Sequence, residues 1–298
     1  MRAERPVSVV IASRDTRLDT AACLSTLAAQ VDASAEVLVV CGSQDGTAEM
    51  VERDFAWARV VRCPPGTGLG ELRARGLAMA TGDPIVFLDV YCRVGPGWLK
   101  RWRDEPWAHY AAVGGLVEPR ARASLGEWAA FLSEYGGYLP PLAAGETDHL
   151  LGNNVGFRRD ALEQAGVMGV PQFWKTFAVW ALAAHGERCW TDPRQVVGHV
   201  RSVTSGDFTI GRYWHGRCFG ANRSDHTSWR TRLVRAATCP ALPVLLTARL
   251  VRDVHPNRAY RRLLWQSLPF VLLYHAAWAL GELDGYVRGP GPACSRLT

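Results

Sequence analysis

The feature that most constrains the fold of this chain is a buried-type apolar run, residues 85–88, which ends on the carboxylate of Asp89. A helix-like stretch, residues 69–81, comes before the run, and the turn Gly82-Asp83-Pro84 separates the two. This order is typical of a helix followed by a buried strand in an open α/β sheet, where ligands bind outside the carboxyl ends of the strands. An acid that merely begins a turn would fit the same place. The position makes Asp89 a candidate to face a nucleotide, a sugar hydroxyl or a metal.

The first third of the chain alternates between short β-branched runs and helical stretches. This alternation predicts a mostly parallel sheet flanked by helices. Between about residues 112 and 200 the pattern is irregular, and a late strand is predicted at residues 196–200, after the turn Thr191-Asp192-Pro193. The predicted strands are residues 7–11, 36–40, 58–62 and 85–88, and the predicted helices are residues 16–30, 45–54 and 69–80.

Composition limits the class of protein and of partner. The chain has 298 residues, of which 48% are hydrophobic and 21% charged, as in a globular protein large enough to bury a full core. Its net charge of +6 comes almost entirely from arginine, since Lys100 and Lys175 are the only lysines. This charge fits anionic partners such as nucleotide sugars or acidic lipid headgroups. Nucleic acid is a poor fit, because no known module or repeated basic pattern accompanies the charge.

Cysteines and glycines exclude several other kinds of site. The eight cysteines are scattered without a C-x-x-C pair, and we expect reduced, mostly buried thiols in a cytosolic protein. The first residues run straight into the first predicted strand, so no signal peptide is expected. The segment Gly66-Thr67-Gly68-Leu69-Gly70 has the wrong spacing for a dinucleotide-binding fingerprint and follows the third strand rather than the first.

Short segments on both sides of Asp89 form a set with a characteristic order and spacing. They are Pro6-Val7-Ser8-Val9-Val10-Ile11, Ala12-Ser13-Arg14-Asp15, residues 23–30, Glu36-Val37-Leu38-Val39-Val40, Gly42-Ser43-Gln44-Asp45-Gly46-Thr47, residues 70–76, Gly95-Pro96-Gly97-Trp98-Leu99 and residues 152–160. In order and spacing this set resembles the glycosyltransferases of family 2, which have the GT-A fold. A weaker likeness continues from residue 152 to His199. The resemblance implies a GT-A-like α/β domain over residues 1–225, followed by a helical appendage over residues 226–298.

The resemblance also implies roles for individual residues. In the family, acids after the second and fourth strands hold the nucleoside and a divalent ion, and a Glu-Asp pair that opens a later helix supplies the catalytic base. Carried onto this chain, it predicts Lys175 and Asp89 as catalytic residues, and Asp89 with His199 as ligands of a divalent cation, Mg or Mn. The predicted donor-binding residues are Ala12, Ser13, Arg14, Asp15, Cys41, Ser43, Asp45, Arg73, Asp89 and Tyr91, and the predicted acceptor-side residues are Asn153, Asn154 and Trp174.

Several acids of the family are replaced in this chain. A lysine cannot act as a base at neutral pH unless its pKa is strongly depressed. Three explanations follow: a different base, a metal-poor site in which Lys175 and arginines carry the phosphates, or an inactive enzyme. We expect Lys175 to stabilise the charge of the leaving group, and a surface position near a helix start is the alternative. The replaced positions are Cys41, Tyr91, Trp174 and Lys175, and the other candidate bases are Glu118, Glu134 and Asp148.

Two apolar stretches near the C-terminus, residues 233–250 and 263–280, are flanked by arginines and interrupted by prolines. They could form a buried helical hairpin, two helices in a membrane interface, or true membrane spans. We favour the interface, with arginine anchors on an anionic membrane surface, because residues 279–286 resemble the tail of membrane-associated family-2 enzymes. The expected location is cytoplasmic, peripheral on the inner face of the cell membrane.

The predicted activity is transfer of a sugar from a nucleotide-diphosphate sugar to a glycan, lipid-linked or small-molecule (natural-product) acceptor, with inversion. The Arg-aromatic segment of residues 210–223 would cover the donor diphosphate or a lipid-phosphate acceptor, or would be a packing helix. The alternative to an enzyme is a non-catalytic GT-A-like binding or scaffold protein that kept the fold and lost the acids.

Overall fold

The structure is a computed structural model that describes residues 6–120, 122–225 and 227–297. The chain forms two compact units. The first comprises the residues up to 120 together with residues 140–200, and the second comprises residues 122–139 together with those from 201 onward. All described strands belong to the first unit, whereas the described elements of the second are helices.

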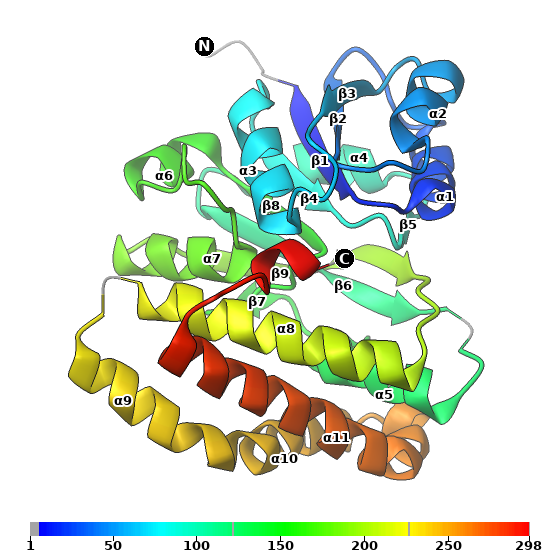
Figure 1. Ribbon diagram of the computed structural model, residues 1–298. Helices are drawn as coiled ribbons and strands as arrows, with labels where there is room; N and C mark the ends of the chain where they lie inside the picture. The colour runs from blue at the N-terminus through cyan, green and yellow to red at the C-terminus, as the bar shows by residue number, and fades with distance from the viewer. Residues whose placement is uncertain (1–5, 121, 226, 298) are drawn as a thin grey trace. The chain divides into compact units, whose positions relative to one another are not determined.

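The nine strands described in the first unit form one mixed sheet (Figure 1). Its order is β3-β2-β1-β4-β8-β6-β9-β5, with β7 paired to β9. Strands β3, β2, β1 and β4 are parallel, whereas β8 is antiparallel to both β4 and β6. The strands are β1 (Val7–Ser13), β2 (Ala35–Cys41), β3 (Arg59–Arg62), β4 (Ile85–Leu88), β5 (Cys92–Val94), β6 (Ala112–Pro119), β7 (Gly145–Glu146), β8 (Asn154–Phe157) and β9 (Cys189–His199).

The carboxyl ends of β1, β2 and β4 lie at one edge of the sheet. Ser13 is level with Cys41, and Val10 is level with Phe87, which places Asp89 at the same edge. All residues of β1 are buried, as expected for a parallel strand covered on both faces. The predicted position of Asp89 is therefore confirmed.

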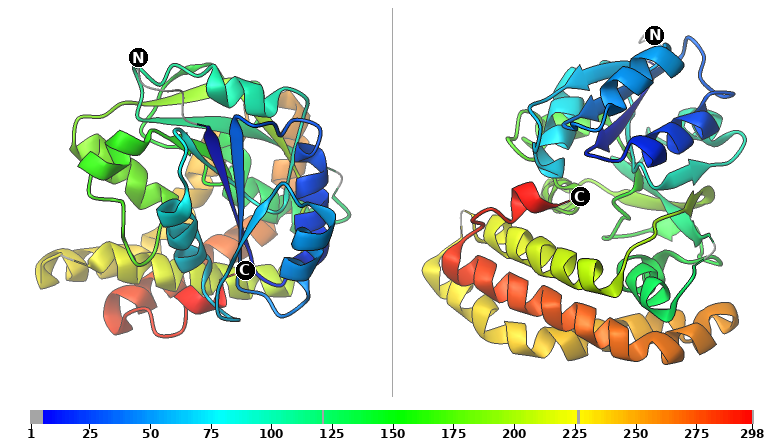
Figure 2. Two further views of the ribbon diagram at one scale, coloured as in Figure 1. Left: turned by 90° about the horizontal axis from the view of Figure 1, so that it is seen from above. Right: turned by 45° about the vertical axis from the view of Figure 1, so that its right-hand side comes forward.

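Helices cover both faces of this sheet (Figures 1 and 2). On one face Val10 and Phe87 pack with Leu72 of α3 and Leu182 of α7, and α6 joins the same cluster. Helices α1, α2 and α4 lie on the other face. The helices predicted in the first third of the chain are confirmed. The helices of this unit are α1 (Arg17–Leu27), α2 (Thr47–Asp54), α3 (Leu69–Met79), α4 (Trp98–Arg103), α6 (Arg159–Gln164) and α7 (Lys175–Ala184).

The late strand is longer than the sequence pattern predicts. β9 begins at Cys189, so Thr191-Asp192-Pro193 lies inside the strand, and the prediction of a turn before it is wrong. The pairing of β6 with β9 shifts register here, and a bulge of this kind tolerates a proline. The Asp192 carboxylate accepts hydrogen bonds from the backbone N–H (2.8 Å) and the guanidinium (2.6 Å) of Arg194, which stabilises the bulge.

In the second unit, α8 and α11 lie side by side along their lengths (Figures 1 and 2). Glycines allow this close approach: a Cβ at Gly281 would stand 2.0 Å from the carbonyl oxygen of Tyr213. The N-cap Thr204 accepts a hydrogen bond from the Asp207 N–H (3.1 Å), which fixes the start of α8. The elements are α5 (Leu125–Tyr135), η1 (Gly136–Tyr138), α8 (Ser205–Ser224), α9 (Trp229–Thr238), η2 (Cys239–Ala241), α10 (Leu242–Val254), α11 (Arg258–Arg288) and η3 (Cys294–Arg296).

The compact units divide the chain differently from the boundary predicted between residues 225 and 226. Helix α8 belongs with α11, because the two pack along each other, although the boundary of independently folding domains stays a prediction. Both apolar stretches near the C-terminus are helical. Within the described residues, Trp229–Val254 and Arg258–Arg288 are long and apolar enough to cross a membrane, which by itself is weak evidence of membrane association.

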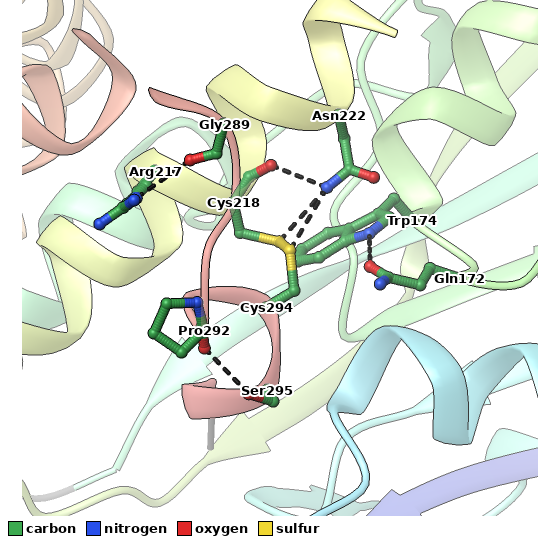
Figure 3. Close-up of a disulfide and its surroundings, with 9 residues drawn as sticks. All are labelled: Gln172, Trp174, Arg217, Cys218, Asn222, Gly289, Pro292, Cys294 and Ser295. Atoms are coloured by element: carbon green, nitrogen blue, oxygen red, sulfur yellow. Dashed lines mark hydrogen bonds between the residues drawn. A yellow bond between two sulfur atoms is a disulfide. The ribbon is translucent and has the colours of Figure 1, made fainter. Parts of the chain in front are cut away.

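A disulfide joins Cys218 of α8 to Cys294 (Figure 3). The Asn222 side-chain amide donates to the carbonyl oxygen of Cys218 (2.7 Å) and lies within 3.5 Å of both sulfur atoms. The prediction that all cysteines are reduced is wrong for this pair. The chain returns along α8 after α11, which brings two cysteines 76 residues apart to a Cα–Cα distance of 5.1 Å, within the range of a disulfide. The other six cysteines are free thiols.

Candidate active site

The turns that follow β1 and β2 are tied together at the carboxyl edge of the sheet. The Asp15 N–H donates to Ser43 Oγ (2.8 Å), and the Asp15 carboxylate accepts from the Gln44 N–H (3.0 Å). Asp15 has a φ of 50°, a left-handed conformation that is uncommon outside glycine. The structure therefore brings Asp15 and Ser43, two predicted donor-binding residues, into one small assembly.

The remaining predicted residues of these two strands differ in exposure. Ala12, Ser13 and Cys41 are buried, so backbone groups are what they could offer to a ligand. The Ser13 hydroxyl is hydrogen-bonded to that of Thr20 (2.8 Å) inside the protein. Arg14 is half-buried beside them. A role for these residues in donor binding stays a prediction.

Asp45 is occupied in holding the start of α2. Its carboxylate accepts from the backbone N–H groups of Arg17 (2.9 Å) and Thr47 (3.1 Å). Burial on its own would raise the pKa of Asp45, but the hydrogen bonds from Thr47 and Arg17 bring it below the ordinary value. Its ionised carboxylate is therefore stabilised by the fold itself, as expected for a turn and helix cap.

Asp89 faces a cation at the end of β4. Its carboxylate lies 3.9 Å from the guanidinium of Arg73 on α3, and both side chains are largely buried. The Asp89 N–H donates to the carbonyl oxygen of Asn153 (3.1 Å), and its own carbonyl oxygen accepts from the Cys92 N–H (2.9 Å). The sequence predicts both Asp89 and Arg73 as donor-binding residues, and the structure places them together.

The side chains near Asp89 do not fit a resident divalent ion. Tyr91 stands in the second acidic position, and the ring of the buried His199 lies 6.1 Å from the Tyr91 ring, measured between centroids. Among the described residues, no three His, Cys, Asp or Glu side chains are grouped so that they could hold a metal ion. Arg73, which faces the Asp89 carboxylate, lies at this edge. Positive charge for a bound phosphate would therefore come from cationic side chains here.

Lys175 opens α7 and points into the interior of the first unit. It is 8% exposed, and its ammonium lies 5.7 Å from the centre of the Phe87 ring. Burial, and then the nearby charge of Arg73, lower the pKa of Lys175 to about 7, against the opposing influence of Asp89 and Cys92. The alternative of a solvated surface lysine does not hold, because the helix begins against the sheet.

The three predicted acceptor-side residues have different surroundings. Asn154 is fully buried, and its side chain accepts from Trp98 Nε1 (3.1 Å) and donates to the carbonyl oxygen of Gln195 (2.9 Å). Trp174, the N-cap of α7, donates from Nε1 to the Gln172 side chain (3.3 Å; Figure 3). Asn153 is buried, yet neither polar atom of its side chain has a hydrogen-bond partner in the described chain. Of the three, Asn153 is the one with unused polar groups.

The other candidate bases are less suited to the site. Glu118 and Asp148 are exposed, and Glu134 belongs to the second unit. There Glu134 lies 3.6 Å from the guanidinium of the buried Arg212. Arg212 begins the set of arginines in the segment of residues 210–223, which lies within α8. Further ion pairs in the same unit are Arg217 with Asp284 (3.1 Å) and Arg223 with Glu282 (3.5 Å), which supports a packing helix.

Sequence reasoning missed two residues that shape the surroundings of Lys175. Phe87 presents its ring to the ammonium group, and Gly152 leaves space for the lysine stem, since a Cβ there would lie 3.3 Å from Lys175 Cδ. Phe87 could have been found from its place two residues before Asp89 in a buried strand. Gly152 gave no comparable signal, because its neighbour in space is distant in sequence.

Comparisons with known proteins agree with this geometry. A model of Glycosyl transferase family 2 matches residues 8–165, more than half of the chain. A search of curated proteins found no match.

Solved structures give the fold. The chain is similar to the mannosyltransferase PcManGT from Pyrobaculum calidifontis in complex with GDP-Man and Mn²⁺, with a TM-score of 0.57 and 18% identity over 95% of this chain and 88% of that one. It is also similar to S. aureus TarS 1–349 in complex with UDP-GlcNAc, with a TM-score of 0.53 and 14% identity over 94% and 91% of the two chains. These likenesses confirm the expected GT-A fold. By the family match, the chain belongs to glycosyl transferase family 2.

Proposed function

We propose that this protein transfers a sugar, with inversion, from a nucleotide-diphosphate donor to a hydroxyl of a glycan, lipid-linked or natural-product acceptor. The observation that carries the proposal is the grouping at one sheet edge of the Asp15–Ser43 turns and the Arg73–Asp89 pair. Ligands of open α/β sheets bind at this edge. The family match and relatives solved with GDP-Man and UDP-GlcNAc support a donor of the same class.

In this proposal Asp89 and Arg73 have complementary tasks. Asp89 accepts hydrogen bonds from donor hydroxyls, and Arg73 balances the charge that develops on the departing diphosphate. Both side chains are largely buried, where a fixed charge acts more strongly than in water. Cationic stabilisation of this kind supports transfer without a step that runs through a metal ion.

Calorimetry with UDP, GDP and dTDP, each with and without Mn²⁺, tests donor binding. We expect one of the three nucleotides to bind, and Asp89→Asn to weaken that binding about 10- to 100-fold, the usual effect of losing hydrogen bonds to a charged group. Asp54→Asn is the matched control, because Asp54 pairs with Arg53 on the surface of α2 and should leave affinity unchanged. If none of the nucleotides binds, the proposed function is refuted.

The alternative is a binding or scaffold protein that lacks catalysis. The replaced acids at Cys41, Tyr91, Trp174 and Lys175 favour it. The two functions differ in one measurement: release of the nucleoside diphosphate from sugar-linked forms of whichever nucleotide binds, UDP, GDP or dTDP, with water as the acceptor. A protein that binds a nucleotide tightly and releases no nucleoside diphosphate at any pH would be a scaffold.

We also propose attachment to an anionic membrane surface, on the cytoplasmic face, through the second unit. Trp229 (70% exposed) on α9 and Val244 (68%) on α10 are large apolar side chains without cover, and Leu280 on α11 is similarly exposed. Apolar side chains next to arginines suit the boundary between headgroups and acyl chains. The exposed arginines of the same helices are Arg230, Arg249, Arg252, Arg258, Arg261, Arg262 and Arg288.

Flotation with phosphatidylcholine vesicles, with and without phosphatidylglycerol, tests this attachment. The full chain should float with the anionic vesicles, and the double variant Trp229→Ser, Val244→Ser should remain in the soluble fraction. Leu18→Ser, at a leucine of the first unit that is even more exposed, is the control that should float normally. Point variants are preferable to truncation at residue 225, which would remove α11 from its packing against α8. Equal recovery of all proteins in the soluble fraction would contradict attachment.

A further inference from the structure

Contacts with α3 fix the place where Lys175 enters the site. The Phe173 N–H donates to the carbonyl oxygen of Gly70 (2.8 Å), and a Cβ at Gly70 would stand only 3.2 Å from Trp174 Nε1. The start of α7 therefore packs closely on the first turn of α3. Arg73 follows Gly70 by three residues and so lies on the same face of α3, turned toward the start of α7.

The Lys175 side chain is buried without a carboxylate partner. Its stem passes Gly152 and its amine lies over the Phe87 ring. In the described part of the chain, no Asp or Glu oxygen lies within the 4.0 Å of an ion pair with Lys175, and the Asp89 carboxylate instead faces Arg73. Buried charges are ordinarily paired, because an unpaired one is costly in a medium of low dielectric constant. The unpaired amine therefore either awaits a ligand or loses its proton.

Burial, and then the charge of Arg73, favour loss of the proton from the Lys175 amine. The groups that face Lys175 are Arg73 from α3, Asp89 after β4 and the Cys92 thiol of β5. Burial and Arg73 together outweigh Asp89 and Cys92, and the pKa of about 7 leaves a large share of the amine neutral at neutral pH. A neutral amine has a lone pair that accepts a proton, and a catalytic pKa near the working pH is the most effective one.

A second unused polar group lies on the same face of the sheet. Asn153 stands just before β8, and the alternation of side chains along the strand puts it on the side of Val155, opposite to Asn154. Val155 packs with Phe87 on the face that α7 covers. The unbonded Asn153 amide and the unpaired Lys175 amine therefore share one face near the sheet edge. Buried polar groups normally have a hydrogen-bond partner, and a hydroxyl group of a bound ligand would be that partner here.

We propose that Lys175, rather than an acid, is the proton acceptor of the transfer, an inference that rests on the proposed function. The acceptor oxygen attacks the anomeric carbon of the donor sugar, and its proton passes to Lys175 Nζ, which becomes an ammonium. The bond from the anomeric carbon to the diphosphate oxygen breaks, and its electron pair leaves with the nucleoside diphosphate. Arg73 balances the new negative charge, and Asn153 orients the attacking hydroxyl.

The protonation state of Lys175 can be measured directly, because the chain has only two lysines, Lys100 and Lys175. With ¹³C-labelled lysine the chain gives two Cε signals by NMR, and Lys100→Arg assigns them. The Lys175 signal should move with a midpoint near pH 7, and Arg73→Gln should shift that midpoint to higher pH by removing a repelling charge. A wild-type midpoint above pH 9 would overturn the assignment, because the amine would then be charged throughout the neutral range.

Kinetics separate a proton acceptor from a fixed cation. Release of UDP, GDP or dTDP, from the donor whose nucleotide the wild-type protein binds, should show a kcat/KM that falls as the pH drops below about 7. Lys175→Arg keeps the positive charge but cannot take up a proton, so the rate should fall about 10²- to 10⁴-fold while donor affinity by calorimetry is retained. An unchanged Lys175→Arg rate would refute the role of Lys175 alone. Absence of any nucleotide binding by the wild-type protein would instead refute the proposed function.

Discussion

Replacing glycine by alanine should change the stability of the second unit in opposite directions at two glycines, because only one of them lies where α8 and α11 are in backbone contact. In Gly281→Ala the new methyl group would stand 2.0 Å from the carbonyl oxygen of Tyr213 and 2.9 Å from the backbone nitrogen of Arg217. Both obstacles are backbone atoms of α8, which cannot turn aside as a side chain can. The two helices must therefore move apart.

The size of the effect follows from two opposing terms. Alanine in place of glycine stabilises a helix interior by about 1 kcal/mol, whereas forcing extra volume into a packed interior costs about 1–3 kcal/mol. We expect the upper end of that cost, because separation also loosens the contacts of Gly216 and Gly285 at the same crossing. Net destabilisation of about 2 kcal/mol is the result.

Gly211→Ala, earlier in α8, is the matched control. A Cβ at Gly211 would meet nothing within 4 Å, so only the helix-propensity gain of about 1 kcal/mol remains. Urea unfolding followed by circular dichroism at 222 nm, with the disulfide intact in both variants, measures the two effects. If Gly281→Ala is as stable as Gly211→Ala, the helices are not in backbone contact at this crossing and the reasoning fails.

Two further predictions concern protonation and the cysteines. Burial and the neighbouring Asp192 raise the pKa of Glu105, so the folded protein keeps a proton that the unfolded chain releases, and stability falls as the pH rises from the ordinary carboxyl range to mildly alkaline values. Glu105→Gln should remove this slope in the Tm measured from pH 5 to 9, and an unchanged slope would contradict the assignment. Thiol titration in denaturant should count six free cysteines before reduction and eight after it, whereas eight at the outset would contradict the disulfide between Cys218 and Cys294.

The parallel part of the sheet could be predicted because its signals are local. Strands β1, β2 and β4 are covered on both faces, so their sequences are mostly apolar runs. Asp89 ends such a run, and parallel strands bring their carboxyl ends to one edge, which was enough to place it. The helices between these strands followed from the same alternation.

Features that depend on distant pairing could not be predicted in this way. Asp192-Pro193 is a sequence typical of a turn, but in the structure it lies in a bulge within β9, where β9 pairs with β6. Cys218 and Cys294 carry no spacing that indicates a disulfide, and they meet only because α11 returns along α8. The same packing removes α8 from the unit that contains the sheet.

The chemistry of Lys175 depends both on local sequence and on contacts between residues that are distant in sequence. Its position followed from the family resemblance, whereas its proton affinity depends first on burial and then on the charges of Arg73 and Asp89, which only the fold brings near. A bound diphosphate would add negative charge to the same surroundings and favour the ammonium form, so the pKa of Lys175 should rise when the donor binds. Because kcat/KM reports the free enzyme and kcat the complex, the acid limb of kcat should lie at higher pH than that of kcat/KM. Coincident limbs would mean that the diphosphate binds too far from Lys175 to influence it, and the proton would then be taken up remote from the leaving group.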